Sequence, residues 1–223
     1  MPRAIVFDFD GVIADSEMLS NSVLAEFVTE LGVPTTLEDS YTNFMGKRFH
    51  EVVEAIEATI GRKLPDGFAE DYQRRTLERF RRELRPIEGA REFIEALIDI
   101  PRCIASSSSP DRLALCLDVL NMTDLFQERV FSASNVARGK PHPDIFLYAA
   151  QELGVKAEEC VVIEDSVGGV IAARAAGATV IGLTAASHIR IGHEAKLLEA
   201  GARYVVRSFN QAQEIIRPLF GSR

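Results

Sequence analysis

The chain has 223 residues, of which 47% are hydrophobic and 26% are charged, and its formal net charge is −8. These values are typical of a soluble globular protein with one sizeable core, or a core with a smaller insert, and the acidic balance argues against a large nucleic-acid surface. The three cysteines lie in apolar contexts, which indicates buried thiols in a reducing compartment. Neither a leader segment nor an apolar run of membrane-spanning length is evident, so we expect a cytoplasmic protein with no membrane partner.

The first predicted element is a buried parallel strand over residues 4–7 that runs into the motif Asp8-Phe9-Asp10-Gly11-Val12. Residues two apart on a strand or its first turn point to the same side, so we expect Asp8 and Asp10 to face one space. Two carboxylates held there cost electrostatic energy that a bound cation or a shared proton would offset. Gly11 permits a sharp turn and a close approach to a ligand. The competing interpretation is an Asp-rich strand end that simply feeds a turn.

Three helices with no strand between them are predicted next. Apolar residues recur at helical spacing over residues 18–31, 49–60 and 68–84, and glycine or proline residues end each pattern. This indicates a helical insert spanning residues 14–86 and not a strand–helix crossover. The third helix also carries a row of arginines that we interpret as an exposed face with salt bridges: Arg74, Arg75, Arg79, Arg81, Arg82 and Arg85.

From residue 89 onward, predicted strands and helices alternate. Strands are expected at residues 103–105, 129–131, 160–163, 179–181 and 204–206, with helical patterns between and after them. Repeated units of this length predict an α/β fold with a Rossmann-like, mostly parallel sheet and helices on both faces. Residues 1–13 and 87–223 would form this core.

Polar residues gather where these strands end. Ligands of open α/β sheets bind beyond the carboxyl ends of the strands. Taken singly, each residue has a structural explanation: a polar loop or helix cap for the serine run, a solvated loop lysine, and an acidic helix start. Taken together they indicate a site, because each would otherwise need an independent explanation. The residues of this candidate site are Asp8, Asp10, Ser106 with its neighbours, Lys140, Glu164 and Asp165.

This set of side chains suits phosphoryl transfer. Carboxylates from two strands make a hard oxygen site of the kind that Mg²⁺ prefers. A hydroxyl and backbone amides near Ser106 and Ser107, with the cation of Lys140, suit phosphate oxygens. One aspartate could attack phosphorus to form an acyl phosphate, and a second carboxylate beside it could exchange a proton with the leaving or attacking oxygen.

The motifs resemble a known family. In the order of this chain, Asp8-Phe9-Asp10-Gly11-Val12, Ala105-Ser106, Lys140-Pro141 and Glu164-Asp165-Ser166 are similar to those of the haloacid dehalogenase-like hydrolases, in particular the β-phosphoglucomutase-like phosphatase branch. The resemblance spans nearly the whole chain. It implies a helical cap domain inserted after the first strand of a Rossmann-like core.

The resemblance also implies roles for the motif residues. Asp8 would be the nucleophile and Asp10 the general acid and base, while Ser106 and Lys140 would bind the transferring phosphoryl group. Magnesium would be surrounded by Asp8, the backbone carbonyl of Asp10, Glu164 and Asp165.

Substrate-binding residues are expected at two places. The segment Gly46-Lys47-Arg48 looks like the substrate loop of the family's cap, although it also reads as a solvated helix start. Ser107 and Ser108 follow the phosphate serine and are expected to touch substrate. We assign no role to His142.

The sequence therefore predicts a Mg²⁺-dependent phosphatase that acts on a small phosphorylated metabolite, a sugar phosphate or a sugar-acid phosphate similar to 6-phosphogluconate. Two alternatives remain: a β-phosphoglucomutase-type isomerase and a non-catalytic phosphate-sensing module. Mutase members characteristically carry a histidine where Ser20 stands, and Asp10 argues against carbon–halogen chemistry. We expect a monomer or a weak homodimer that has no nucleic-acid partner.

Overall fold

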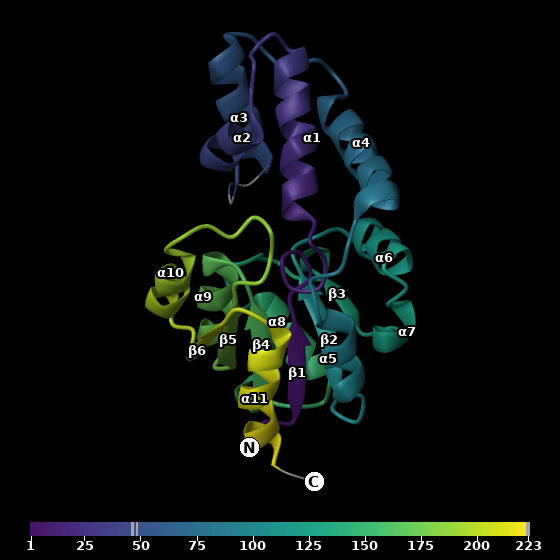
Figure 1. Cartoon of the computed structure of the whole chain (residues 1–223), viewed down its shortest axis with the longest axis vertical. Coiled ribbons are helices and arrows are strands. Elements are labelled where there is room, and N and C mark those ends of the chain that lie inside the picture. The colour runs from purple at the N-terminus through teal and green to yellow at the C-terminus, as the bar shows by residue number, and fades with distance from the viewer. Residues whose placement is uncertain (46, 48, 222–223) are drawn as a thin grey trace. The chain divides into compact units, whose positions relative to one another are not determined.

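The computed structural model describes residues 1–45, 47 and 49–221, and it divides into two compact units (Figure 1). The α/β unit comprises Met1–Asp15 and Arg85–Arg223, and the helical unit comprises Ser16–Leu84. The chain thus passes between the units at residues 15–16 and 84–85. The sequence analysis expected these two boundaries after residues 13 and 86. Among the described residues, no helix combines the length and the apolar character needed to cross a membrane.

The α/β unit is built on a six-stranded sheet with the order β3-β2-β1-β4-β5-β6. All neighbouring strands pair in parallel, with Val6 of β1 opposite Cys103 of β2 and Val162 of β4. This confirms the predicted Rossmann-like α/β fold. The strands are β1 (Ala4–Phe7), β2 (Arg102–Ser106), β3 (Val130–Ser132), β4 (Cys160–Glu164), β5 (Thr179–Leu183) and β6 (Tyr204–Val206).

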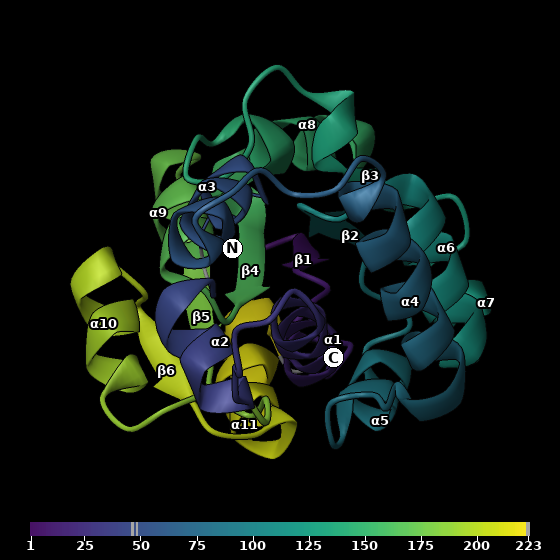
Figure 2. The same ribbon diagram turned by 90° about the horizontal axis from the view of Figure 1, so that it is seen from above.

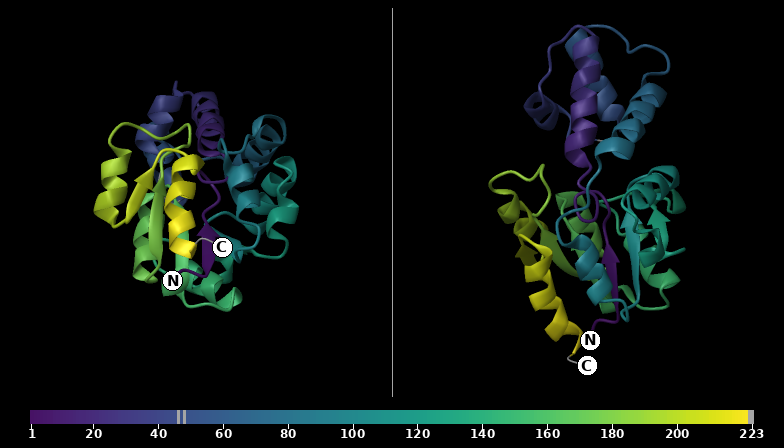
Figure 3. Two further views of the ribbon diagram at one scale, coloured as in Figure 1. Left: turned by 60° about the horizontal axis from the view of Figure 1, so that its bottom comes forward. Right: turned by 45° about the vertical axis from the view of Figure 1, so that its right-hand side comes forward.

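Helices cover both faces of this sheet (Figure 3). Ala4 and Val6 belong to an apolar cluster with α8 (Asp144–Glu152), α9 (Val167–Ala175) and α10 (His193–Ala200). The alternate residue Phe7 makes edge-to-face contacts on the other face with Phe93 of α5 (Ala90–Ala96) and Phe126 of α7 (Thr123–Phe126). The remaining elements of the α/β unit are α6 (Pro110–Val119), α11 (Phe209–Phe220) and the short 3₁₀ helices η1 (Ala133–Asn135) and η2 (Ala157–Glu159).

The helical unit, whose helices are seen from above in Figure 2, has its own apolar core. It consists of α1 (Glu17–Glu30), α2 (Leu37–Asn43), α3 (Phe49–Ile60) and α4 (Phe68–Glu83). Phe27 of α1 lies at its centre, edge to face with Phe68, while the guanidinium of Arg75 lies 4.1 Å from the Phe27 ring centroid. Arg75 also pairs with Glu30 at 2.7 Å, and Arg79 pairs with a neighbouring α1 glutamate at 2.8 Å. The interpretation as an exposed, salt-bridged face fits Arg74, which pairs with Asp71 and Glu78. Arg75 and Arg79 are partly buried and pair with α1 instead, and Arg85 lies beyond the end of α4.

The prediction of three helices in this unit was wrong, because the described residues form four. The additional helix, α2, lies in the segment that the sequence analysis interpreted as a polar link. Its start is fixed by a reciprocal cap in which the Asp39 amide donates to the Thr36 hydroxyl at 3.1 Å and the Thr36 amide donates to the Asp39 carboxylate at 2.8 Å. Seven residues with little apolar content give no detectable period, so only the cap indicated this helix.

The two crossover segments pair with each other inside the α/β unit. Ala14 and Pro86 form an antiparallel bridge, and the Asp15 amide donates to the Arg85 carbonyl at 3.0 Å. The Ile87 amide also donates to the Ile13 carbonyl at 2.8 Å. The chain therefore leaves and re-enters the α/β unit at one point.

Candidate active site

Three neighbouring strands bring their carboxyl ends together at one edge of the sheet. Asp8 follows β1 directly, and its amide extends the ladder by donating to the Ile163 carbonyl at 2.9 Å. Ser106 ends β2 and Glu164 ends β4, so both flank Asp8. All three side chains are buried, and Glu164 is completely so. The parallel register thus places the predicted polar residues side by side.

Lys140 lies between two of these carboxylates. Its ammonium donates to Asp8 Oδ1 at 2.8 Å and to Glu164 Oε1 at 2.7 Å, and its side chain is only 8% exposed. A solvated loop lysine is therefore excluded. Burial alone would lower the pKa of Lys140, but the charges of Asp8 and Glu164 outweigh it and hold the pKa above its ordinary value. Lys140 is thus a permanently charged cation at the site.

Asp8, Glu164 and Asp165 form a buried acidic group whose ligand atoms lie within 4.8 Å of one another. Burial raises the pKa of Asp8 well above its usual value; Lys140 opposes this shift, whereas the other two carboxylates reinforce it. One lysine does not balance three carboxylates, so the site carries an excess of negative charge. Hard oxygen donors with unbalanced negative charge are what a divalent cation such as Mg²⁺ binds, so the donor set fits this ion.

Two glycines make room for these carboxylates. A Cβ atom on Gly11, whose φ is +80°, would lie 1.9 Å from Asp165 Oδ2, and a Cβ atom on Gly169 would lie 1.5 Å from Glu164 Oε1. Glu164 is also fixed by the start of α9, since its second oxygen accepts from the Ser166 amide at 2.8 Å and the Ser166 hydroxyl at 3.0 Å. The glycines therefore have a steric role in the arrangement of the acids.

Asp10 has partners different from those of Asp8. Its Oδ1 lies 2.6 Å from the guanidinium of Arg112, and its Oδ2 accepts from the Ser108 hydroxyl at 2.6 Å. The strand ends at Phe7, so the alternation that predicted one shared space for both aspartates no longer fixes the direction of Asp10. Its carboxylate accordingly interacts with the β2–α6 segment.

The serine run after β2 divides into residues with separate contacts. The buried Ser106 hydroxyl accepts from the Ser108 amide at 3.1 Å, while Ser107 is exposed. Ser109 caps α6 by accepting from the Arg112 amide at 3.4 Å. The helix-cap interpretation of the run is thus correct for Ser109 alone.

Sequence reasoning missed several residues that contact the predicted site, among them Arg112 and His188. Arg112 stands in the first turn of α6, where the helix dipole disfavours a cation, and that mismatch was a usable signal of a nearby anion. His188 follows β5, and its Nε2 lies 3.3 Å from Asp165 Oδ2. The rule that ligands gather beyond strand ends applied to β5 as well, but no candidate was chosen there.

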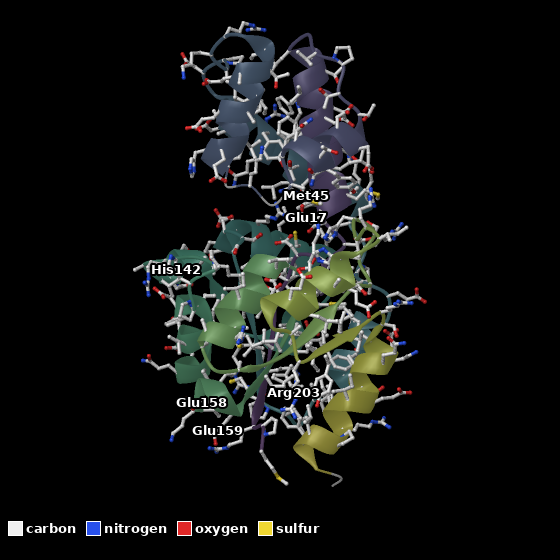
Figure 4. All side chains as sticks on the ribbon, turned by 90° about the vertical axis from the view of Figure 1, so that its left-hand side faces the viewer. Glu17, Met45, His142, Glu158, Glu159 and Arg203 are labelled. Carbon is white, nitrogen blue, oxygen red and sulfur yellow. The ribbon has the colours of Figure 1, made fainter. Side chains whose placement is uncertain are left out.

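The other predicted residues lie elsewhere. Lys47 is exposed within the helical unit, whereas Gly46 and Arg48 lie outside the described residues. His142, to which no role was assigned, is exposed on the loop before α8 (Figure 4).

Together, the parallel sheet and the buried cluster at its carboxyl edge define a Rossmann-like α/β protein with an acidic, lysine-paired centre. The family model of the haloacid dehalogenase-like hydrolases matches residues 2–177, and the chain belongs to this family. The resemblance stated from the sequence is therefore confirmed.

Individual relatives are similar over most of the chain. A 6-phosphogluconate phosphatase of Escherichia coli is 30% identical over 75% of this chain and 76% of its own length. Hexitol phosphatase B of the same species is 32% identical, covering 78% of this chain and 79% of its own. Among solved structures, a haloacid dehalogenase family hydrolase of Deinococcus radiodurans with bound phosphate and sodium has a TM-score of 0.83 and 36% identity, covering 96% of this chain and 95% of its own.

Proposed function

We propose that this protein is a Mg²⁺-dependent phosphatase that hydrolyses a small phosphate monoester, a sugar phosphate or a sugar-acid phosphate, through an aspartyl phosphate on Asp8. The observation that carries the proposal is the buried Asp8 carboxylate, which one lysine and two further carboxylates surround at the carboxyl edge of the sheet. Relatives named as phosphatases of 6-phosphogluconate and of hexitol phosphates support the reaction and the substrate class.

The residues present support the following steps. Asp8 attacks phosphorus, the bond from phosphorus to the leaving oxygen breaks, and Asp10 gives that oxygen its proton. Asp10 then takes a proton from water, whose oxygen attacks phosphorus and releases inorganic phosphate and free Asp8. Lys140 and Ser106 bind the phosphoryl oxygens and offset their charge throughout.

The residues that would hold Mg²⁺ are Asp8, Glu164, Asp165 and the backbone carbonyl of Asp10. When bound, the ion supplies two positive charges near the phosphoryl oxygens. Lys140 balances part of the negative charge of the three carboxylates. A bound Mg²⁺ ion would balance the rest.

Asp8→Asn and Asp10→Asn test the proposal as a pair. Wild-type protein with Mg²⁺ should release phosphate from p-nitrophenyl phosphate and from 6-phosphogluconate or a hexitol phosphate. Asp8→Asn removes the nucleophile, so activity should fall to background and no phosphoprotein should form. Asp10→Asn keeps the nucleophile but loses a proton shuttle worth about 10²–10⁴-fold, so it should accumulate phosphate on the peptide that contains Asp8.

Two results would reject this function. One is wild-type protein that releases phosphate from none of these esters, as a phosphate sensor would. The other is a phosphate adduct mapped to the Ser106–Ser109 run in place of Asp8. A mutase would instead convert a sugar phosphate without net phosphate release, although Ser20 offers no imidazole at the position where mutase members carry histidine.

We also propose that the helical unit selects the substrate through its Gly46-Lys47-Arg48 segment. Lys47→Ala should raise KM for the sugar phosphate several-fold and leave that for p-nitrophenyl phosphate nearly unchanged, because the aryl ester lacks a polar remote end. Lys63→Ala is the matched control, since Lys63 is an exposed lysine of the same unit that pairs with Glu57. Equal effects of the two substitutions would reject the assignment of Lys47.

A further inference from the structure

We infer that Arg112 is a positioning residue that acts through Asp10: with Ser108, it fixes the carboxylate that exchanges the proton. The inference rests on the proposed function, because it concerns the acid and base step of that reaction.

Both oxygens of Asp10 contact a donor from the segment that follows β2. Arg112 Nη2 lies 2.6 Å from Oδ1, and the Ser108 hydroxyl donates to Oδ2 at 2.6 Å. The Arg112 and Asp10 side chains are 22% and 15% exposed, so water competes weakly for this pair. Two short charge-assisted contacts on separate oxygens fix the plane of a carboxylate as well as its position. Asp10 is therefore held in one orientation.

The donors are themselves fixed to the sheet. The Ser108 amide donates to Ser106 Oγ at 3.1 Å, and the Ser132 hydroxyl at the end of β3 donates to the Ser108 carbonyl at 2.7 Å. The Arg112 amide donates to the Ser109 cap of α6. Asp10 is thus tied to the ends of β2 and β3 and to the start of α6, although it follows β1 in the chain.

The position of Arg112 is unfavourable without Asp10. It lies in the first turn of α6, where the positive end of the helix dipole repels a cation. No gain in helix stability explains an arginine there, whereas the negative charge of Asp10 offsets the repulsion. This placement favours a role that depends on Asp10 over a role in the helix.

In the proposed reaction, Asp10 transfers a proton, and that transfer depends on how its carboxyl group is oriented. An orientation error of a carboxylate by about 1 Å can cost about 100-fold in rate, so fixing Asp10 has a measurable value.

The test compares the first chemical step for two leaving groups. With enzyme in excess, Arg112→Ala should slow release of the alcohol from an alkyl phosphate about 10- to 100-fold, since a poor leaving group needs a well-placed proton. Release of p-nitrophenol, which needs little protonation, should change less than about threefold. Arg112→Lys keeps the charge and should recover part of the rate. Arg207→Ala, which breaks an exposed ion pair with Glu194 on the same unit, is the control and should change neither rate.

A double-variant cycle separates positioning from other roles. In an Asp10→Asn background, Arg112→Ala should cause no further loss, because its effect passes through Asp10. Full additivity in this cycle, equal losses with both leaving groups, or a raised KM at unchanged rate would overturn the inference; the last would make Arg112 a direct substrate contact. A misfolded Arg112→Ala would be recognised by its melting curve, and Ser108→Ala then tests the same prediction from the other oxygen.

Failure of the proposed function has a different signature. Wild-type protein that cleaves neither ester rejects the phosphatase assignment and the inference with it. Wild-type activity with a leaving-group-independent defect in Arg112→Ala rejects the inference alone.

Discussion

The buried acidic group requires a residue without a side chain at position 169, and Gly169 meets this requirement. Glu164 is the completely buried acid of the cluster, and its carboxylate occupies the volume that any side chain at position 169 would need. The contact would be 1.5 Å to Oε1, the oxygen that accepts from Lys140, while Oε2 accepts from the Ser166 amide at the start of α9, so both oxygens of Glu164 are held in place.

Gly169→Ala should therefore displace Glu164 and weaken Mg²⁺ binding about tenfold or more, as changes next to metal ligands do. Binding is measured by calorimetry and by the Mg²⁺-dependent rise in melting temperature. Gly168→Ala is the matched control on the same helix turn, because nothing lies within 4 Å of its Cβ position. That control should keep full Mg²⁺ affinity and gain up to about 1 kcal/mol of stability. Wild-type Mg²⁺ affinity in Gly169→Ala would show that Glu164 does not hold the ion.

At the residue scale, the sequence predicts which side chains gather at neighbouring strand ends. It does not predict side-chain contacts between segments that are distant in the chain. Asp8, Ser106 and Glu164 could be grouped, because the ends of parallel strands meet at one edge whatever the loops do. The Arg112–Asp10 pair joins residues about a hundred positions apart and depends on the direction of Asp10 after the strand has ended. No local pattern encodes that direction.

Among the elements, the junction of α5, β2 and α7 depends on Arg102. This arginine is 8% exposed, and its guanidinium donates to the Leu125 carbonyl of α7 at 3.1 Å and to three carbonyls of the turn that follows α5, of which Ile98 is nearest at 2.9 Å. It thus joins this turn to α7 through hydrogen bonds from one side chain.

Arg102→Ala should lower the free energy of unfolding by about 2–3 kcal/mol, because buried and part-buried carbonyls lose charge-assisted hydrogen bonds. Urea titration measures the loss. Arg207→Ala on the same unit removes only an exposed pair and should cost less than about 1 kcal/mol. Similar losses for the two variants would mean that water replaces Arg102 without penalty.

Strands and long helices were predictable, and the shortest helices were not. Each strand of the sheet contains a short apolar run bounded by polar or turn residues, so each has a clear signal. The helices α2 and α7 have seven and four residues, which is too few for an apolar period to be recognised. Their boundaries depend on caps and tertiary contacts.

For the molecule as a whole, the paired crossovers make the helical unit an insertion with adjacent ends. The bridge between Ala14 and Pro86 and the hydrogen bond from Asp15 to Arg85 belong to the α/β unit and need nothing from residues 16–84. Both units also have separate apolar cores. The insertion was readable from the sequence because three helical patterns without a strand interrupt the strand–helix alternation.

A chain in which a short Gly/Ser linker joins Asp15 to Arg85 should therefore fold. We expect it to keep the α/β sheet, to unfold cooperatively and to bind Mg²⁺ with the affinity of the full chain. Circular dichroism, thermal melting and calorimetry check these points against the intact protein. A linker-closed chain that lacks a cooperative transition would show that the helical unit is required for the α/β unit to fold.

The paired crossovers also shorten the search that folding requires. Val6 must pair with Cys103 although the whole helical unit lies between them in the chain, and a parallel pairing so distant in sequence is slow to form. Residues 16–84 can form their own core from local contacts. Once the contact between Asp15 and Arg85 has formed, these residues no longer lengthen the loop that the pairing of β1 with β2 must close. The entropic free-energy cost of closing this shorter loop is about 1 kcal/mol lower than for the open chain. An insertion that seems to separate the central strand from its partner thus leaves β1 kinetically close to β2.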